Sequence, residues 1–114
     1  MNNYVKLLTE IGFGIDLLDG KDIIAVKRAI HDIIHRVCLS FFEETGIKTS
    51  DSILYIKVYT PHPEEVSDES LIEEIPIKFK EIHIEKYKGG GITMGIKGNI
   101  VVAIAFLEIY VPLS

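Results

Sequence analysis

Hydrophobic residues recur along the chain with two different periods, which predict strands and helices. Residues 4–11 cluster valine, leucine and isoleucine as a strand does, and we expect it to end at Gly12-Phe13-Gly14, because glycine relaxes the backbone. In residues 22–45, apolar side chains recur at three- and four-residue steps, which predicts one long amphipathic helix. Asp22 can cap the start of this helix, and Gly46 can end it in a left-handed turn.

The second half of the chain predicts three more strands and a short helix. Residues 52–60 alternate as a strand does, and the prolines that follow end it. Residues 67–75 form a short helix with Ser67 at its start, broken by Pro76. Residues 77–87 alternate strictly apart from one slip near Glu81, which indicates a strand with one wet face and a bulge. Residues 100–107 are continuously apolar and predict a strand that is buried on both faces.

This order of elements predicts an α+β fold with two layers, β-α-β-α-β-β, in a single domain over residues 1–114. We expect a mixed four-stranded sheet with the first two strands parallel, the last two antiparallel, and both helices on one face. The other face of the sheet then has no cover within the chain. We therefore expect a homo-oligomer that buries this face.

Composition narrows the class of protein. The 114 residues suffice for one domain with an ordinary core, and the single cysteine, Cys38, lies on the apolar stripe of the long helix, where packing explains it. The start of the chain does not have the pattern of a secretory leader, and residues 100–107 are too few to span a bilayer, so a cytoplasmic protein that does not bind membranes is expected. The abundance of Lys, Glu and Ile is typical of a thermophile or of an AT-rich genome.

Charge excludes one class of partner and suggests another. The net charge of −5 comes without a basic stripe, so we expect no binding to nucleic acid. Six acidic residues fall between residues 64 and 74, which contain no basic residue. This segment is either a solvated helix face or the contact surface of a partner-binding module.

The segment that follows the first strand is the main candidate for chemistry. Gly12 and Gly14 would let backbone amides approach a ligand, and Asp16 beside them could act as an acid or base. The spacing fits neither a dinucleotide fingerprint nor a calcium-binding loop. The alternative is a purely structural turn, with Asp19-Gly20 as the tight turn. Of the residues in this segment, Asp16 is the one that this alternative explains least.

Three further places carry weaker signals. His62 is held rigid between two prolines at a strand end, a position where sites often occur. The loop with Gly90 and Gly91 could face a ligand as a flap or could be a plain hairpin. His31 and His35 share a helix face at metal-ligand spacing, but no third ligand is evident, so we expect no metal and no cofactor.

The segment Gly12-Phe13-Gly14-Ile15-Asp16 resembles the hallmark of a small family of conserved proteins of bacteria, archaea and plants, whose signature is Gly-x-Gly-x-Asp-x-His-Gly. The resemblance extends to residues 58–66, to the loop at residues 89–91 and to the apolar last strand. Where the family has His-Gly, this chain has Leu18-Asp19-Gly20, so the histidine is lost. If that histidine is catalytic in the family, this member either lacks the activity or supplies a group from His62 or His35.

The family brings no assigned reaction. The element order also resembles the Bacillus chorismate mutase-like fold of trimeric chorismate mutase and the YjgF-type imine deaminases, whose ligands lie between subunits, and this favours a trimer. Both enzymes bind a carboxylate of their ligand through arginine. This sequence has no arginine after Arg36, so neither activity is favoured. Two functions remain: a small polar metabolite bound or transformed at an inter-subunit cleft near Asp16, or a non-catalytic module that binds a partner through residues 64–74.

Overall fold

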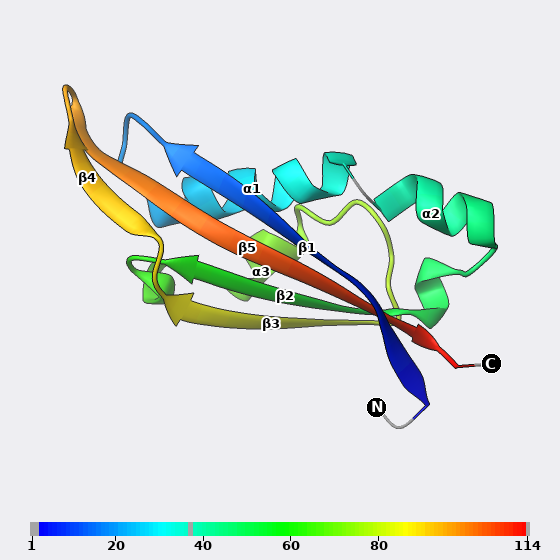
Figure 1. Cartoon of the computed structure of the whole chain (residues 1–114). Helices are drawn as coiled ribbons and strands as arrows, with labels where there is room; N and C mark the ends of the chain where they lie inside the picture. Colours follow the sequence, from blue (N-terminus) through cyan, green and yellow to red (C-terminus); the bar gives the residue numbers. More distant parts are fainter. Residues whose placement is uncertain (1–2, 37, 114) are drawn as a thin grey trace.

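The computed structural model describes residues 3–36 and 38–113, and the side chains of residues 35–41 lie outside that description. Within these ranges the chain forms an α+β fold in which helices cover one face of a sheet (Figure 1). The strands are β1 (Tyr4–Asp16), β2 (Ile53–Thr60), β3 (Glu81–Lys88), β4 (Gly91–Gly95) and β5 (Gly98–Pro112). The helices are α1 (Asp22–Arg36), α2 (Cys38–Thr45) and α3 (Asp68–Ile72), with short 3-10 turns η1 (Thr49–Asp51) and η2 (Pro63–Glu65).

The sheet has five strands, not the four expected, in the order β1-β5-β2-β3 with β4 paired to β5. Strands β1 and β2 both run antiparallel to β5 and therefore parallel to each other, as predicted, but β5 lies between them. Strand β3 is parallel to β2 and does not pair with the last strand. The antiparallel partner of β5 after the glycine loop is instead β4, which pairs with β5 beyond the end of β2.

Several element boundaries differ from the prediction. Strand β5 spans Gly98–Pro112 rather than residues 100–107, and α3 ends at Ile72 rather than at residue 75. Strand β1 does not end at its glycines but continues through them to Asp16, in register with β5. Strand β3 begins at Glu81, so the alternating residues 77–80 precede it. The bulge lies in β1, between Lys6 and Leu8, and not near Glu81.

The helical half of the fold follows the predicted signals closely. The predicted helix over residues 22–45 is present as α1 and α2, between which residue 37 lies outside the description. Gly46 ends α2 in a left-handed conformation, with φ of +74° and its N–H donating to the Phe42 carbonyl. Ser67 caps α3 by accepting a hydrogen bond from the Ser70 N–H. The packing predicted for Cys38 lies outside the described side chains. None of the helices in the described ranges is long and apolar enough to cross a membrane.

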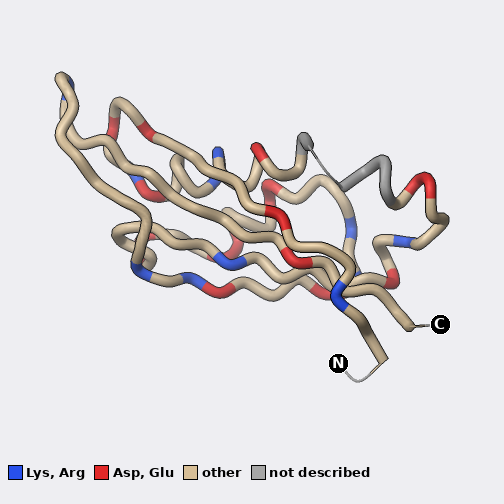
Figure 2. The backbone as a smooth tube through the Cα atoms, in the orientation of Figure 1, with Lys and Arg blue, Asp and Glu red and all other residues tan. Residues whose placement is uncertain are grey.

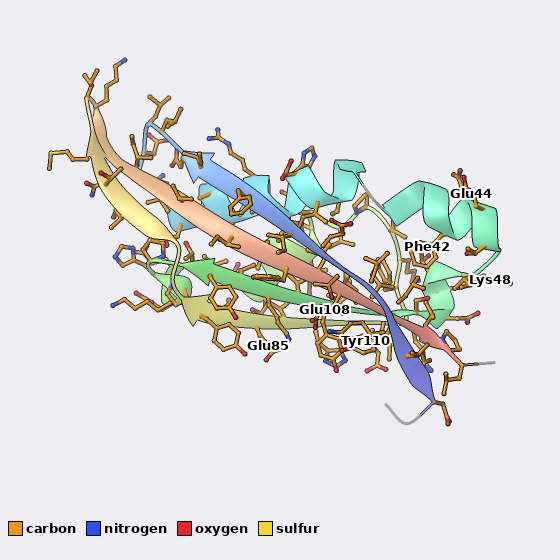
Figure 3. All side chains as sticks on the ribbon, in the orientation of Figure 1. Phe42, Glu44, Lys48, Glu85, Glu108 and Tyr110 are labelled. Atoms are coloured by element: carbon orange, nitrogen blue, oxygen red, sulfur yellow. The ribbon has the colours of Figure 1, made fainter. Side chains whose placement is uncertain are left out.

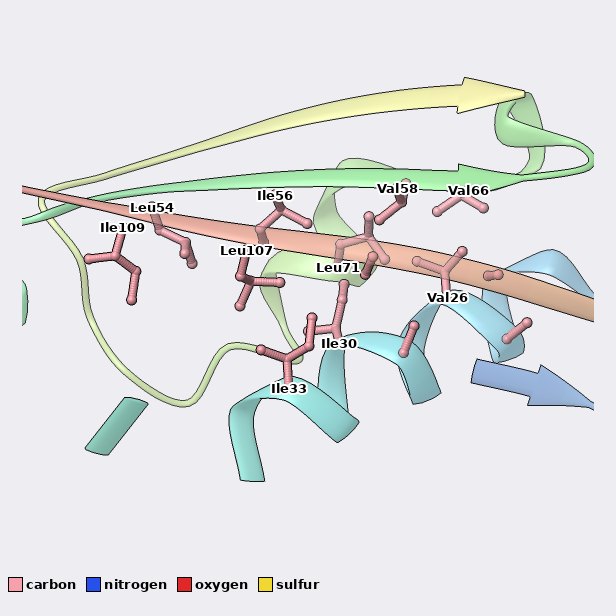
Figure 4. Close-up of a cluster of buried hydrophobic side chains, with 14 of the residues drawn as sticks. Val26, Ile30, Ile33, Leu54, Ile56, Val58, Val66, Leu71, Leu107 and Ile109 are labelled. Carbon is pink, nitrogen blue, oxygen red and sulfur yellow. The ribbon is translucent and has the colours of Figure 1, made fainter. Parts of the chain in front are cut away.

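The core lies between the sheet and the helices, and Figure 4 shows it as interdigitating aliphatic side chains. Alternate residues of β5, such as Leu107 and Ile109, point to Ile30 and Ile33 of α1 and are fully buried. Burial of such side chains contributes about 1.5–3 kcal/mol each, so this layer dominates the stability of the domain.

The opposite side of the sheet, here called the open face, has no helix over it in the described ranges. The residues of β5 that point there, such as Ile104 and Phe106, are only half-buried. The prediction that residues 100–107 are buried on both faces is therefore wrong for the single chain, because the chain supplies a second layer on one side only.

Candidate functional site

One end of the sheet brings together the end of β1, the start of α1 and the end of β2. There the carboxylate of Asp22, whose side chain is fully buried, accepts three hydrogen bonds. Thr60 Oγ1 and the His62 N–H donate to Oδ2, at 2.5 and 2.7 Å, and His62 Nδ1 lies 3.0 Å from Oδ1. The buried Asp22 therefore fixes the ring of His62, and the other ring nitrogen, Nε2, is the one left for a ligand.

The local sequence explains why these groups meet. Thr60 is the last residue of β2, and the alternation of that strand turns its side chain into the protein. The prolines on either side of His62 stop the sheet and restrict the backbone, so His62 begins η2 close to the strand end. Asp22 is the first residue of α1, where the helix dipole favours a negative charge.

The pKa values of the pair move in opposite directions. Burial by itself would raise the pKa of Asp22, but the hydrogen bonds from Thr60 and from His62 lower it below its ordinary 3.8. The hydrogen bond to Asp22 raises the pKa of His62 above 6.5, and the nearby charges of Glu65 and Glu64 add to this. Both shifts favour the charged forms of the pair, Asp22 as the carboxylate and His62 as the imidazolium.

Asp16 lies next to this pair and shapes the loop that leads to it. Its side chain is buried, and it accepts hydrogen bonds from the backbone N–H groups of Leu18, Asp19 and Lys21, the last at 2.9 Å. The hydrogen bond from Lys21 lowers the pKa of Asp16 below 3.8, in spite of the burial that opposes it. Asp16 thus holds the connection that ends at Asp22, whose own carboxylate is the one that contacts His62.

The predicted ligand-binding glycines lie in two different settings. An ideal Cβ on Gly14 would lie 1.9 Å from the carbonyl oxygen of Ala25, and one on Gly12 would lie 2.5 Å from that of Ala29. In this structure the backbone that approaches these glycines is therefore that of α1. Gly90 has φ of +66° and packs on the backbone of Val102, while space is open around Gly91.

The glycine loop nevertheless belongs to the same end of the sheet as His62. The N–H of Gly89 donates to the carbonyl of Thr60 at 3.0 Å, two residues before His62. A shallow, open hollow lies beside Asp22 and is lined by Gly20, Lys21, Ile23 and Glu65 as well. Of the predicted site residues, the structure thus brings Asp16, His62 and the glycine loop to one region.

Among the described residues, Asp22, His62 and Glu65 form the group whose ligand atoms could hold a metal ion, since these atoms lie within 4.8 Å of one another. Glu65 Oε2 is 3.9 Å from His62 Nδ1. The pair His31 and His35 cannot be assessed as a metal site, because the side chain of His35 lies outside the description. The nitrogen of His62 that lies in the Asp22, His62 and Glu65 group is Nδ1. It lies 3.0 Å from Asp22 Oδ1, and we assign it to that hydrogen bond rather than to a metal ion.

A second polar group lies on the open face and was not predicted. Glu108, in the middle of β5, is nearly buried, and its carboxylate is bracketed by Lys6 Nζ at 2.9 Å and Lys57 Nζ at 3.2 Å. Figure 3 shows Glu108 close to Tyr110 on this side of the sheet. The signal for this group in the sequence is an acidic residue, Glu108, within apolar sequence. Its partners Lys6 and Lys57 lie in β1 and β2, far from it along the chain.

Neutralising Glu108 is expected to cost stability in a pH-dependent way. The hydrogen bond from Lys6 lowers the pKa of Glu108 below 4.5, so its contribution is present above pH 4.5 and is lost as the pH falls through the folded pKa. Glu108→Gln should lower the free energy of unfolding by about 1–2 kcal/mol at pH 7, measured by urea denaturation, and by much less at pH 3. Glu64→Gln, at an exposed position, is the control. A difference from wild type that stays constant between the two pH values would contradict this assignment.

Comparison with known proteins decides the family. The profile of a conserved hypothetical protein family, Lin0512, matches residues 6–109. The chain belongs to the Lin0512 family. This confirms the coarser part of the prediction, a family of conserved hypothetical proteins, whereas the N-terminal signature stays a prediction. No curated protein matches this Lin0512 chain.

A solved structure supports the fold of the Lin0512 chain. It is similar to the crystal structure of an FtsZ-like protein of unknown function from Nostoc punctiforme, with a TM-score of 0.80 and 24% sequence identity. The match covers 96% of this chain and 97% of that one. At this level of identity the similarity shows a shared fold over the full length, and the function has to be argued from the site.

Proposed function

We propose that the protein is a homo-oligomer that binds or transforms a small polar metabolite at a subunit boundary, at the end of the sheet where Asp22 and His62 meet. The observation that carries this proposal is the buried Asp22 carboxylate, which holds His62 Nδ1 at 3.0 Å. A histidine with one nitrogen held by a buried carboxylate and the other available is suited to proton transfer.

The roles of the residues follow from their contacts. Neutral His62 can accept a proton at Nε2, and the resulting imidazolium is stabilised by Asp22, with Glu65 3.9 Å from its ring. Asp16 acts as a positioning residue, because its carboxylate holds the backbone of the loop before Asp22. Gly90 and Gly91 remain in the proposal as the flap over this end of the sheet, with Gly12 and Gly14 supporting the site through the packing of α1.

The oligomer belongs to the same proposal. The open face exposes large apolar side chains, including Ile11, Phe13 and Ile15 of β1, and nothing in the described chain covers them. The order β1, α1–α2, β2, α3, β3 keeps the predicted alternation of strands and helices, and β4 adds a fifth strand before β5. We base the proposed chorismate mutase-like assignment, whose trimers place ligands between subunits, on this alternation. That assignment favours a trimer with the site near a subunit boundary.

The acidic segment at residues 64–74 supports the alternative, a partner-binding module, less well. Two of its acidic groups have partners within the chain: Asp68 Oδ1 lies 2.8 Å from Lys86 Nζ, and Glu74 Oε1 lies 3.8 Å from Lys27 Nζ. Figure 2 shows basic residues on both β3 and α1, the elements that carry Lys86 and Lys27. Part of the charge of the segment therefore serves the packing of α3.

A ligand screen with matched variants tests the proposal. A library of small carboxylates, amines, sugar phosphates and nucleosides is screened by thermal shift against wild type, His62→Gln and the control His83→Gln, which changes another half-exposed histidine. A compound at 100 times its Kd adds about 2.7 kcal/mol, which is a shift of several degrees. We expect at least one compound to stabilise wild type and His83→Gln but not His62→Gln. A library in which no compound separates wild type from His62→Gln contradicts the proposal.

A further inference from the structure

The hairpin of β4 and the start of β5 projects from the sheet and has an apolar tip. Gly91–Gly95 pairs with residues 98–102 beyond the end of β2, and Figure 1 shows this hairpin reaching past the ends of the other strands. Ile96 at its turn is fully exposed, Met94 is 83% exposed and Ile92 is about half exposed. The hairpin contains one charged residue, Lys97. An exposed apolar tip of this kind is a sign of an interaction site.

The loop after β1 enlarges this apolar surface. An ideal Cβ on Gly20 would lie 3.0 Å from the Cβ of Asn99, so the loop lies against the base of the hairpin. Leu17 and Leu18 of this loop are both more than half exposed. We call the whole surface the end patch, and its members are Leu17, Leu18, Ile92, Met94 and Ile96.

The chain has a second apolar surface on the open face. Ile11, Phe13 and Ile15 of β1 are exposed there, and each pairs with a half-buried apolar residue of β5. The β5 partners are Phe106, Ile104 and Val102. We call this surface the stripe. It is flat, because it is part of a sheet, whereas the end patch is carried by a projecting hairpin.

The two surfaces lie on opposite sides of the sheet. Met94 pairs with Asn99 and Ile92 with Val101, and Val101 is fully buried on the side of the helices. Val102, the next residue, is the β5 partner of Ile15 in the stripe. Since neighbouring residues of a strand point to opposite faces, Ile92 and Met94 of the end patch lie on the helix side and the stripe lies on the open side. A chain therefore cannot cover its own stripe with its own end patch.

We propose that the end patch of one chain packs on the stripe of a second copy of the chain, in a head-to-tail contact. This rests on the homo-oligomer of the proposed function and names its surfaces. Because the two patches differ and face opposite ways, the contact repeats from chain to chain, and it forms a closed ring where the rotation between neighbouring copies closes. The five large side chains of the end patch are 49–104% exposed, so together they can supply much of the roughly 800 Å² per partner that a stable interface needs.

The contact places the subunit boundary beside the candidate site. Leu17 and Leu18 belong to the loop whose backbone Asp16 holds and which leads directly to Asp22. A partner seated on this loop would cover the side of the hollow formed by Gly20 and Lys21. The assembly and the ligand site are in this way linked by one short segment of the chain.

Mixing two defective variants tests the head-to-tail contact. Met94→Asp/Ile96→Asp removes the end patch and Phe13→Asp removes the stripe, and all three positions are exposed enough for the fold to survive, which circular dichroism checks. Light scattering at about 50 µM should show an oligomer for wild type and monomers for each variant, with the Kd raised roughly 30-fold or more. An equimolar mixture should form dimers, because one intact patch meets one intact stripe. Ile72→Asp, at an exposed apolar position on α3, should leave the oligomer intact.

Each other outcome has a definite meaning. An oligomer that survives Met94→Asp/Ile96→Asp but not Phe13→Asp is a face-to-face assembly, and it overturns the role of the hairpin while leaving the homo-oligomer. A mixture that stays monomeric overturns the head-to-tail contact. A monomeric wild type overturns self-association altogether, whereas the ligand screen with His62→Gln reports separately on the site.

Discussion

Replacing Gly14 with alanine is expected to lower the free energy of unfolding by about 3 kcal/mol or more, or to prevent folding. The added Cβ would lie 1.9 Å from the carbonyl oxygen of Ala25 and 2.4 Å from the amide nitrogen of Ala29. Both contacts are with helix backbone, which cannot rotate away as a side chain can. Helix α1 would have to move off β1, and the core between α1 and β5 would lose its packing.

Urea denaturation of Gly14→Ala beside Gly91→Ala measures this effect. Gly91 lies in β4, where an added Cβ meets nothing within 4 Å, so its replacement should change stability by less than about 0.5 kcal/mol. The pair of variants separates the steric effect from the general consequence of removing a glycine. Equal stabilities for the two variants would show that α1 does not approach β1 as closely as described.

Replacing Asp22 with alanine is expected to cost about 2–4 kcal/mol at pH 6. The change leaves the buried hydroxyl of Thr60 and the N–H of His62 without their acceptor, and it removes a negative charge from the start of α1. Asp19→Ala, which removes an exposed carboxylate from the preceding loop, is the matched control and should be nearly neutral. A loss for Asp22→Ala no larger than that for Asp19→Ala would contradict the described hydrogen bonds.

The cost of Asp22→Ala should depend on pH with a predictable sign. The lowered pKa of Asp22 makes its contribution present above pH 3.8 and lost as the pH falls through the folded pKa. The raised pKa of His62 means that its ion pair with Asp22 contributes fully to stability below pH 6.5. This contribution is lost as the pH rises through the folded pKa of His62. Unfolding measurements should therefore show the largest effect of Asp22→Ala in the weakly acid range.

Local signals in the sequence predicted the helices better than the sheet. The period of α1, the left-handed Gly46 and the Ser67 cap each depend on neighbours within a few residues, and each is present. The sequence predicts that the first strand ends at Gly12 and Gly14, whereas both lie inside β1, where α1 approaches its backbone. The insertion of β5 between β1 and β2 depends on contacts across most of the chain, which no local pattern encodes.

The sequence predicts one of the two residues at the centre of the candidate site, His62. His62 was singled out because two prolines hold it at a strand end, but its partner Asp22 was interpreted only as a helix cap. The two residues are 40 positions apart, so the sequence alone could not pair them. Glu108 is an acidic residue that interrupts apolar sequence, but its partner Lys6 is 102 positions away, and only the fold brings the two together.

Buried Asp22 holds the ring of His62 and raises its pKa, and an NMR titration of the histidine ring signals tests this central claim most directly. In wild type, His62 should titrate with a pKa above 6.5. In Asp22→Asn, which keeps the shape but removes the charge, the pKa of His62 should fall, since the carboxylate that stabilises the imidazolium is gone. A pKa at or below 6.5 in wild type that Asp22→Asn leaves unchanged would contradict the claim.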